Sequence, residues 1–434
     1  MIDGLRRDLQ RPTDPASLAA FRIGFGLLAT FAALRFVALG WVETLLVDPS
    51  FHFAWVSWAV MPPTWGLYAL FGAQALAGLG IAWGRHVRVW LGLWLGSFVY
   101  VELLDKTLYL NHYVLFTMLG VTLLVTPAAH ARFGGPTLPR WVITAFRIEI
   151  ATVYVWAGLA KLNPDWLFRA EPLLTWLQAR AGWPMVGPWI AWDPTAWLMS
   201  WSGAAYDLTI PFLLWAPHTR NVGLALLLGF HIAVGVLFPI GIFPWLMVIA
   251  ATVLLSPSWP RSWLDLPQAT TVVADPISRR GATIWLACMA TIALFPGRAW
   301  FLSNDVAWTE EGYRFGWRVL LNEKTGLVDY RVVERNTGRV WRAYPSAELT
   351  PLQHQHMRTQ PDMIRDYALH LAKRHAAEGR DVAVFADAWA SLNGHPRQRL
   401  IRPDVDLTQS LATLRSNAWI VPRVGRATTP AARQ

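Results

Sequence analysis

The side chains best suited to chemistry lie at the end of a long apolar run, where Lys161 precedes the short polar turn of residues 162–166. Counting back in steps of seven residues, nearly two helical turns, leads to Tyr154 and Arg147, so one helix face carries all three side chains. Ionisable residues inside membrane helices usually face the bundle interior and mark function. Lys161 could be a reactive amine there, although a lysine that only extends its amine to water would give the same pattern.

A second candidate site opens another apolar run, where Asn111 and His112 follow a polar segment that begins at Asp105. Such a pair at the mouth of a helix could supply a proton acceptor and a hydrogen-bond donor to a cavity. The alternative is a histidine that is satisfied by a neighbouring carbonyl group. We expect His112 and Lys161 to contribute to one site, because the predicted topology brings both to the same side of the membrane.

Asp207 and His231 lie inside two further apolar runs. They could pair with each other or with Arg147 to hold helices together, or they could hydrogen-bond a buried ligand. His112 and His231 could also ligate a haem, but we expect them at different depths in the membrane, which argues against it. No Cys and His spacing is typical of a zinc site, so we expect no metal. The single cysteine, Cys288, excludes an intrachain disulfide, and its apolar surroundings predict a packing role.

The composition is that of a polytopic membrane protein. Of the 434 residues, 54% are hydrophobic and 15% are charged, whereas a soluble domain carries about 25% charged residues. The apolar residues fall in runs of roughly 18–22, the length that crosses a bilayer as a helix. Residues 1–299 are therefore predicted to form an all-α bundle. About nine transmembrane helices are expected, at 18–40, 64–83, 89–104, 109–127, 141–161, 197–216, 221–238, 240–256 and 283–299. Two shorter pieces are predicted to be a re-entrant or interfacial helix, at 51–61, and an amphipathic segment on the membrane surface, at 167–195.

Basic residues in the loops predict the orientation of this bundle. Arginines concentrate at the N-terminus and in the even-numbered loops, whereas residues 37–83 and the loop around Phe238 contain no Lys or Arg. The positive-inside rule then places the N-terminus in the cytoplasm and the C-terminal domain outside it. Lys161 and His112 both fall on the outer side. Basic loops that face anionic lipid explain the net charge of +10, so that charge does not indicate a nucleic-acid partner.

After the ninth apolar run, the sequence changes to short alternating stretches, which predict a small extramembrane α+β domain over residues 300–422. The predicted elements are a three-stranded meander at 317–321, 328–334 and 340–344, with turns at 324–326 and 336–338, then a helix at 362–377 and a strand at 382–389. A disordered tail is expected over residues 423–434. We expect this domain to cap the bundle near Lys161 and His112, with residues 313–317 closest to them.

These motifs resemble those of the vitamin K-dependent gamma-glutamyl carboxylase family, in a bacterial-type member with a horizontally transferred transmembrane domain. The elements run in the family's order over residues 18–422. They are Asp105-Lys106-Thr107 with Asn111-His112, Arg147 with Val153-Tyr154, Ala157-Gly158 with Lys161-Leu162 and Asp165-Trp166, Tyr206-Asp207-Leu208, Phe230-His231, Phe238 to Met247 with Phe243 between them, Pro257 to Arg261, Gly312-Tyr313 with Trp317, Phe385 to Asn393, and Gln398 to Asp406. One departure is Ala160-Lys161, where the animal enzymes have two consecutive lysines.

The resemblance implies an enzyme that oxidises a reduced quinone with O2 to its epoxide. The strong base so formed removes a γ-proton from glutamate, which then takes up CO2. Lys161 is implied as the base for the hydroquinone, with His112 assisting. A cofactor site is implied for Asn111, Arg147, Tyr154, Asp207 and His231, and substrate contact for Trp317. The implied partners are membrane lipid, a reduced vitamin K or related isoprenoid hydroquinone, and a glutamate-containing protein or peptide.

Two alternatives to a carboxylase remain open. One is a quinol epoxidase that transfers no CO2 to protein, and the other is a non-enzymatic binding protein that has kept the fold. A hydroquinone is a weak acid in water, so its deprotonation at neutral pH calls for a base such as a neutral amine in a low-dielectric pocket. A scaffold has no need of Lys161 and His112 together, which favours an enzyme. The natural substrate, the quinone species and the oligomeric state do not follow from the sequence.

Overall fold

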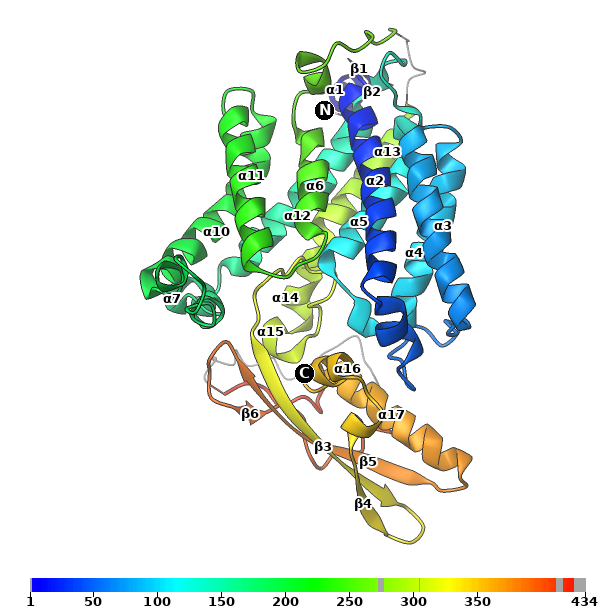
Figure 1. The fold of residues 1–434 in the computed structure, drawn as a ribbon, viewed down its shortest axis with the longest axis vertical. Coiled ribbons are helices and arrows are strands. Elements are labelled where there is room, and N and C mark those ends of the chain that lie inside the picture. The colour runs from blue at the N-terminus through cyan, green and yellow to red at the C-terminus, as the bar shows by residue number, and fades with distance from the viewer. Residues whose placement is uncertain (1, 272–276, 304, 411–416, 425–434) are drawn as a thin grey trace.

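The protein forms a helical bundle with a smaller α+β domain at one end, opposite to the N-terminus (Figure 1). The structure is a computed structural model and describes residues 2–271, 277–303, 305–410 and 417–424. The predicted order of a helical bundle and an α+β domain is confirmed. The side of the membrane that each end faces stays a prediction. Most of the expected disordered tail, residues 425–434, lies outside the described residues.

The bundle has a helix at each position that the apolar runs predict. These helices are α2 (Ala16–Ala38), α3 (Thr64–Trp83), α4 (Val87–Leu104), α5 (Asn111–Val125), α6 (Arg140–Lys161), α10 (Asp193–Trp215), α11 (Arg220–Leu237), α12 (Phe243–Ala251) and α13 (Arg279–Leu294). By length and composition, six segments of the described chain could cross a membrane, namely α2, α3, α4, α6, α11 and Arg279–Leu302. Helix α5 and the stretch Phe243–Leu254 are apolar but shorter. Nine crossings therefore remain a prediction. Cys288, which was expected to be packed inside, is exposed on α13.

Short elements precede, connect and follow the long helices. They are α1 (Ile2–Leu9), β1 (Pro12–Thr13), the π-helical turn η1 (Glu43–Val47), β2 (Leu138–Pro139), α14 (Ala299–Leu302), α15 (Val306–Thr309), and the 3₁₀ turns η2 (Lys106–Leu108), η3 (Pro127–His130), η4 (Thr252–Leu254), η5 (Trp259–Ser262), η6 (Phe295–Arg298) and η7 (Pro345–Ala347). Strands β1 and β2 pair antiparallel. Figure 1 places them beside the N-terminus, at the end of the bundle that is remote from the α+β domain.

Glycine allows α2 and α3 to approach each other closely. A Cβ atom added at Gly26 would lie 2.5 Å from the Gly78 carbonyl oxygen, and one added at Gly78 would lie 2.6 Å from the Gly26 oxygen. Small residues serve this purpose in membrane helices, because apolar side chains gain little over lipid contact there. Next to Gly26 on α2, the Phe25 ring packs edge-on against Trp94 of α4 and Phe116 of α5. These contacts fix the relative positions of the four helices.

Residues 51–61 contain no helix, so the predicted re-entrant or interfacial helix is wrong. The segment runs along the end of the bundle nearest to the α+β domain. Its backbone bonds to the α4–α5 loop, where the Lys106 N–H donates to the Phe53 carbonyl at 2.8 Å. Phe51 and Phe53 pack against the core of the α+β domain. Two of the aromatic residues of this segment are thus explained by contact with another domain.

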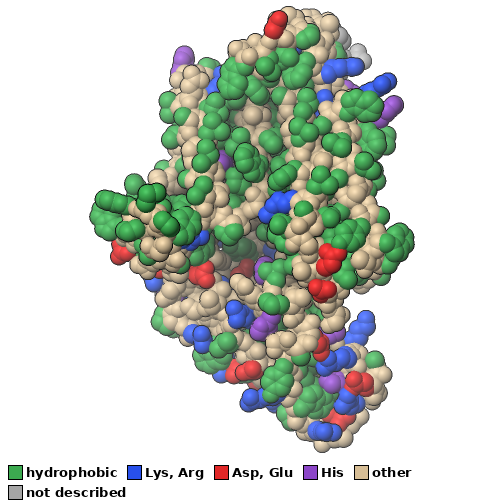
Figure 2. Space-filling view, viewed as in Figure 1, with side chains coloured by type: hydrophobic (Ala, Val, Ile, Leu, Met, Phe, Trp, Pro, Cys, Tyr) green, Lys and Arg blue, Asp and Glu red, His purple; other side chains and the backbone are tan. Residues whose placement is uncertain are grey.

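A Trp-rich segment between α6 and α10 projects sideways from the bundle, beside the ends of α10 and α11 (Figure 1). It contains α7 (Pro164–Arg169), α8 (Leu173–Gln178) and α9 (Gly187–Ile190). Met185 and Trp189 of this segment are 91% and 72% exposed. Figure 2 shows apolar side chains over the bundle and on this projection, whereas charged side chains gather over the α+β domain. Exposed aromatic residues at this level suit the membrane–water boundary.

The α+β domain is a four-stranded antiparallel sheet with strand order β4-β3-β5-β6. Its elements are β3 (Lys324–Glu334), β4 (Val340–Ala343), α16 (Pro351–Met357), α17 (Pro361–Ala377), β5 (Val382–Leu392) and β6 (Gln398–Arg399). Alternation along β3 buries Val328, Tyr330 and Val332, and the Tyr330 hydroxyl donates to the Ile364 carbonyl of α17 at 2.8 Å. The predicted helix at 362–377 and the strand at 382–389 are confirmed.

The predicted meander is wrong in its first strand. Trp317 and Leu320 have φ angles of 54° and 54°, a left-handed conformation that a strand does not use. Residues 324–326, expected to be a turn, belong to β3, and β5 occupies the place beside β3 that residues 317–321 were expected to hold. Residues 310–322, which we call the strap, instead lead from α15 across the end of the bundle to β3.

Two neighbouring residues of the α4–α5 loop fasten the α+β domain to the bundle. The Asp105 carboxylate accepts hydrogen bonds from the Thr107 backbone N–H and hydroxyl, both at 2.8 Å, and from the Gln353 amide of α16 at 2.9 Å. Lys106 pairs with Asp362 and Asp366 of α17. The Asp105-Lys106-Thr107 motif therefore sets the position of the domain that lies over the bundle.

Candidate active site

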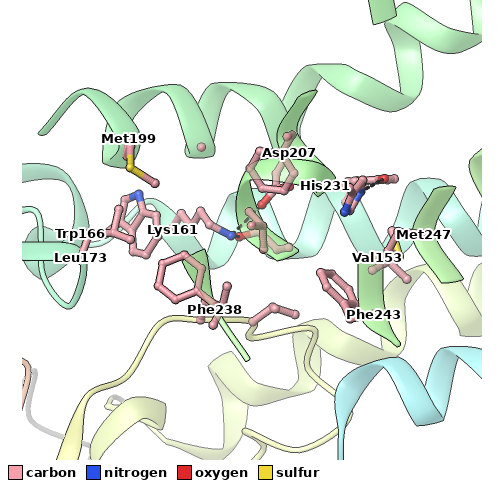
Figure 3. A pocket seen from close by; sticks show the side chains of 17 residues that line it. Val153, Lys161, Trp166, Leu173, Met199, Asp207, His231, Phe238, Phe243 and Met247 are labelled. Carbon is pink, nitrogen blue, oxygen red and sulfur yellow. Dashed lines mark hydrogen bonds and ion pairs between the residues drawn. The ribbon is translucent and has the colours of Figure 1, made fainter. Parts of the chain in front are cut away.

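A small cavity of about 70 Å³ lies inside the bundle, between α6, α10, α11 and α12; we call it the bundle cavity. Its walls are mostly apolar and include Trp166, Phe230, Phe238 and Phe243. Its polar lining residues are Tyr154, Lys161, Asp207 and His231. Four of the residues that the sequence singles out, from three helices, are thus brought together around one apolar space (Figure 3).

Lys161 and Asp207 meet at the centre of this cavity (Figure 3). The Lys161 Nζ lies 2.6 Å from Asp207 Oδ2 and 5.2 Å from the centroid of the Trp166 ring. Only 6% of Lys161 and 5% of Asp207 are exposed. Burial of one charge alone would be costly, so each residue is tolerated here because the other is present. Pairing of Asp207 with His231 or with Arg147, one of the alternatives that the sequence leaves open, is not found, since its partner is Lys161.

Tyr154 and His231 form the second polar pair of the bundle cavity. The Tyr154 hydroxyl lies 3.1 Å from His231 Nε2, between α6 and α11. The other imidazole nitrogen, Nδ1, is buried and has no hydrogen-bond partner among the described residues. A buried nitrogen without a partner is costly in an empty cavity and useful to a polar ligand. The seven-residue spacing of Tyr154 and Lys161 correctly predicts that they face one space.

Arg147 shares the helix of Lys161 but does not line the bundle cavity. Its guanidinium donates to the Val253 and Leu255 carbonyl oxygens at 2.9 and 2.7 Å. It also lies 5.2 Å from the centroid of the Trp215 ring. These carbonyls end the last turn after α12, where the helix leaves its carbonyl oxygens without intrahelical partners. Arg147 therefore stabilises the bundle, and its predicted contact with a cofactor stays untested.

A larger cavity of about 540 Å³ lies where the bundle meets the strap and α16; we call it the junction cavity. Asn111 and His112 line it, and neither lines the bundle cavity. The Asn111 amide donates to the Arg318 carbonyl of the strap at 3.1 Å, and its oxygen accepts from the Tyr109 hydroxyl at 2.9 Å. Asn111 thus helps to hold the strap. His112 Nε2 is buried without a hydrogen-bond partner within the described part of the chain.

Lys161 and His112 therefore lie in adjoining cavities, whereas the sequence predicts one shared site. Three residues line both cavities and form the wall between them, namely Phe243, Val319 and Leu320. The centroid of the Phe243 ring lies 5.7 Å from that of His112 and 5.7 Å from that of His231. One aromatic ring thus separates the two imidazoles, and a reaction that uses both cavities has to act across this wall.

The strap supplies the other half of the wall in a strained conformation. Phe315, Trp317 and Leu320 all have φ angles above 50°, which is rare for bulky residues and costs about 1–3 kcal/mol each. Trp317 is 3% exposed and packs in the bundle core. Its ring lines neither cavity, so its predicted substrate contact stays untested. Residues 313–317, expected to lie closest to Lys161 and His112, line the junction cavity of His112 through Tyr313 and Arg314 but do not line the bundle cavity of Lys161.

The junction cavity has an excess of positive charge. Its cationic lining residues are Arg35, Lys106, Arg314 and Arg318, and its one acidic lining residue is Glu310. Glu310 already pairs with Lys324 at 3.2 Å. Cavities lined by one sign of charge attract ligands of the opposite sign. The arrangement is therefore suited to an anionic substrate that enters from the aqueous side.

Three residues that shape the site were not predicted from the sequence. Phe243 lies within one of the quoted family motifs, so a signal for it exists, although nothing in the motif shows that the ring divides two cavities. Leu320 was predicted to lie in a strand, and Arg35, in the first apolar run, was not among the predicted site residues. In the described residues, no three His, Cys, Asp or Glu side chains come together in a way that could hold a metal ion.

Comparison with known proteins gives two matches in the order of the two structural regions. The family model described as the HTTM domain matches residues 10–259, which is more than half of the chain. The model described as the vitamin K-dependent gamma-carboxylase lumenal domain matches residues 278–425. No solved structure matches the chain. The matches support the resemblance that the motifs indicate.

Proposed function

The chain belongs to the vitamin K-dependent gamma-carboxylase family, and we propose that it couples oxidation of a lipid-soluble hydroquinone to carboxylation of glutamate. The observation that carries this proposal is the buried Lys161–Asp207 pair, which lies in an apolar cavity beside a larger, cationic one. The hydroquinone would bind in the bundle cavity and the glutamate in the junction cavity. Oxidation of the hydroquinone by O2 to its epoxide supplies the strong base that carboxylation requires.

The lining of the bundle cavity suits a hydroquinone ring in its chemistry, but the cavity of about 70 Å³ must widen to admit one, since a cavity that binds benzene measures roughly 150 Å³. Phe230, Phe238 and Phe243 offer aromatic walls. The Lys161–Asp207 pair can accept a proton, and the unpartnered His231 Nδ1 offers a separate hydrogen-bonding atom. A ring with two hydroxyl groups can contact both the ion pair and His231 Nδ1. The fit therefore rests on an apolar wall and two polar groups, which is the usual composition of a small-molecule site.

Lys161 would act as the base, and Asp207 would hold the proton that the pair already shares. The pair begins with one proton shared between the amine and the carboxylate, and so with no net charge. Accepting a second proton from a hydroquinone hydroxyl leaves the pair with one positive charge beside the deprotonated oxygen, so the cavity stays neutral overall. The sequence-based expectation was an isolated neutral amine. The paired carboxyl group makes such an amine available, because it can hold the first proton while Lys161 accepts the second.

His112 would act on the side of the glutamate substrate. It lines the cationic junction cavity, and its buried Nε2 could contact a substrate group there. The wall of Phe243, Val319 and Leu320 keeps water in the larger cavity away from Lys161. This supports a division of labour in which the base chemistry stays dry while the charged substrate remains close.

The proposal includes nine membrane crossings, with the N-terminus in the cytoplasm and the α+β domain outside. It rests on the loop arginines and on the position of α1 and the α+β domain at opposite ends of the bundle. A reporter enzyme that is active only in the cytoplasm, fused after Gln434, should be silent. Activity of that fusion would show that the orientation is the reverse of the one proposed. Extracellular glutamate would then have no access to the junction cavity.

The decisive assay supplies the purified protein with a reduced isoprenoid naphthoquinone, O2, labelled hydrogencarbonate and a glutamate-containing peptide. Epoxide and peptide-bound label are measured separately. Formation of both products supports the carboxylase. Formation of neither, with protein that melts cooperatively, would contradict the proposal.

A quinol epoxidase without carboxylation is the second candidate. The observation that favours it is the wall itself, because the bundle cavity is complete without the junction cavity. In the same assay this candidate predicts epoxide without peptide-bound label, and an epoxidation rate that does not change when the peptide is omitted.

A further inference from the structure

The cations of the junction cavity are not equivalent. Lys106 pairs with Asp362 and Asp366, and Arg314 pairs with Asp362 at 2.6 Å. These side chains are used to join the α+β domain to the bundle. Arg35 has a different role, because it lies in the last turn of α2 and faces the same cavity from the bundle side.

The Arg35 guanidinium lies over the Trp41 ring, 4.7 Å from its centroid. No acid and no hydrogen-bond acceptor contacts it among the residues that the structure describes. On the other side, Gly241 has a φ of +62°, and a Cβ atom added there would lie 3.7 Å from Arg35 Nη1. The loop backbone thus approaches the guanidinium without bonding to it.

Two other arginines of the bundle show what a structural role looks like in this protein. Arg22, on the same helix, donates to the carbonyl oxygens of Ala82 and Ala131 at 3.0 and 3.3 Å and also to Ile81. Arg147 is saturated by two carbonyl oxygens. Both side chains are buried. Arg35 instead presents its donors to a cavity, held by an aromatic ring that leaves the edge of the guanidinium open.

We propose that Arg35 binds the carboxylate of the glutamyl substrate in the junction cavity. A guanidinium matches a carboxylate through two parallel hydrogen bonds. The cavity volume of about 540 Å³ is many times the roughly 30 Å³ that one water occupies, so it suits a side chain with adjoining backbone more than a hydrogencarbonate ion. Because His112 lines the same cavity, a carboxylate on Arg35 would lie on the His112 side of the Phe243 wall.

This inference rests on the proposed function for the identity of the substrate, but its test needs neither quinone nor turnover. A fluorescent peptide with one glutamate, and the same peptide with glutamine, are titrated against the purified protein, and anisotropy gives both dissociation constants. The wild type should prefer the glutamate peptide. Arg35→Gln should weaken binding of the glutamate peptide by about 10- to 100-fold and leave binding of the glutamine peptide nearly unchanged. Arg35→Lys should give an intermediate loss, since lysine keeps the charge without the fork.

Arg331→Gln is the matched control, because Arg331 also lies over an aromatic ring, 4.4 Å from the Phe385 centroid, but on the remote sheet of the α+β domain. It should bind both peptides as the wild type does. A structural role for Arg35 would lower the melting temperature without changing the preference for glutamate over glutamine. An unchanged preference in Arg35→Lys and Arg35→Gln, or no preference in the wild type, would overturn the inference. Arg35-dependent binding without any epoxide or fixed label would instead contradict the proposed function alone.

Discussion

Lys161 and Asp207, 46 residues apart in the sequence, form a buried ion pair with 2.6 Å between Nζ and Oδ2. Removing one partner leaves a buried charge without compensation, which typically costs about 3–5 kcal/mol, whereas replacing both partners by apolar residues is often neutral. Asp207→Leu should therefore lower the melting temperature strongly. The double variant Lys161→Met/Asp207→Leu should recover most of that loss. If the losses in melting temperature of the two single variants simply added up in the double variant, the two side chains would not be coupled.

His231 offers a test of hydroquinone binding. His231→Phe keeps an aromatic ring of similar size but removes Nδ1, so it should raise KM for the hydroquinone by up to about tenfold, the value of one hydrogen bond. The same change should weaken equilibrium binding of the oxidised quinone. Tyr154→Phe is the control, because it removes the partner of Nε2 and leaves Nδ1 in place. Equal effects of the two substitutions on binding would show that His231 Nδ1 does not bind the hydroquinone.

Phe243 should control the coupling of the two half-reactions. Phe243→Ala opens the wall between the cavities, so we expect more epoxide per carboxylated glutamate. Phe230→Ala is the matched control, since Phe230 lines only the bundle cavity and stacks on Tyr206 at 4.0 Å. Both truncations cost stability, typically about 3–5 kcal/mol. A product ratio that changes equally in both variants would count against a specific role for the wall.

The ion pairs of Asp362 join the α+β domain to the bundle, and their stabilising effect should disappear at low pH. Burial alone would raise the pKa of Asp362, but the Arg314 guanidinium and the Lys106 ammonium outweigh it and hold the pKa at about 2. The unfolded value is about 3.9. Because the folded pKa is the lower one, the stabilisation is complete above about pH 4 and is lost as the pH falls toward 2.

Asp362→Asn should therefore lower the melting temperature at neutral pH and approach the wild-type value as the pH falls toward 2. Asp329→Asn, on the exposed face of β3, should not change it at either pH. A difference between wild type and Asp362→Asn that stays constant down to the lowest pH would assign the effect to packing and not to charge.

The helices were predictable because apolar run length alone limits where a chain can cross lipid. Two local predictions failed where apolar residues meet protein in place of lipid. Phe51 and Phe53 pack against the α+β domain, and Trp317 and Leu320 adopt left-handed angles that no alternating pattern reveals. In both cases tertiary contacts override the local signal, and those contacts cannot be read from a single sequence.

The candidate site was predictable where one helix carries it. The spacing of Tyr154 and Lys161 gives their common face, whereas the partner of Lys161 comes from α10 and could not follow from periodicity. The division into two cavities depends on Phe243 and on the backbone of the strap, which no spacing rule encodes. Arg35 was hidden for a related reason, because its importance lies in the contacts that it lacks.

The central claim is that Lys161 takes a proton from a hydroquinone, and the rate of epoxide formation by Lys161 variants tests it most directly. Lys161→Arg can keep the ion pair with Asp207 and hence the fold, but arginine stays protonated and cannot act as a base. We expect this variant to melt close to the wild type and to lose about 10²–10⁴-fold in epoxidation rate, as Lys161→Ala should. Full epoxidation by a folded Lys161→Arg protein would show that the lysine only pairs with Asp207, and would contradict the mechanism.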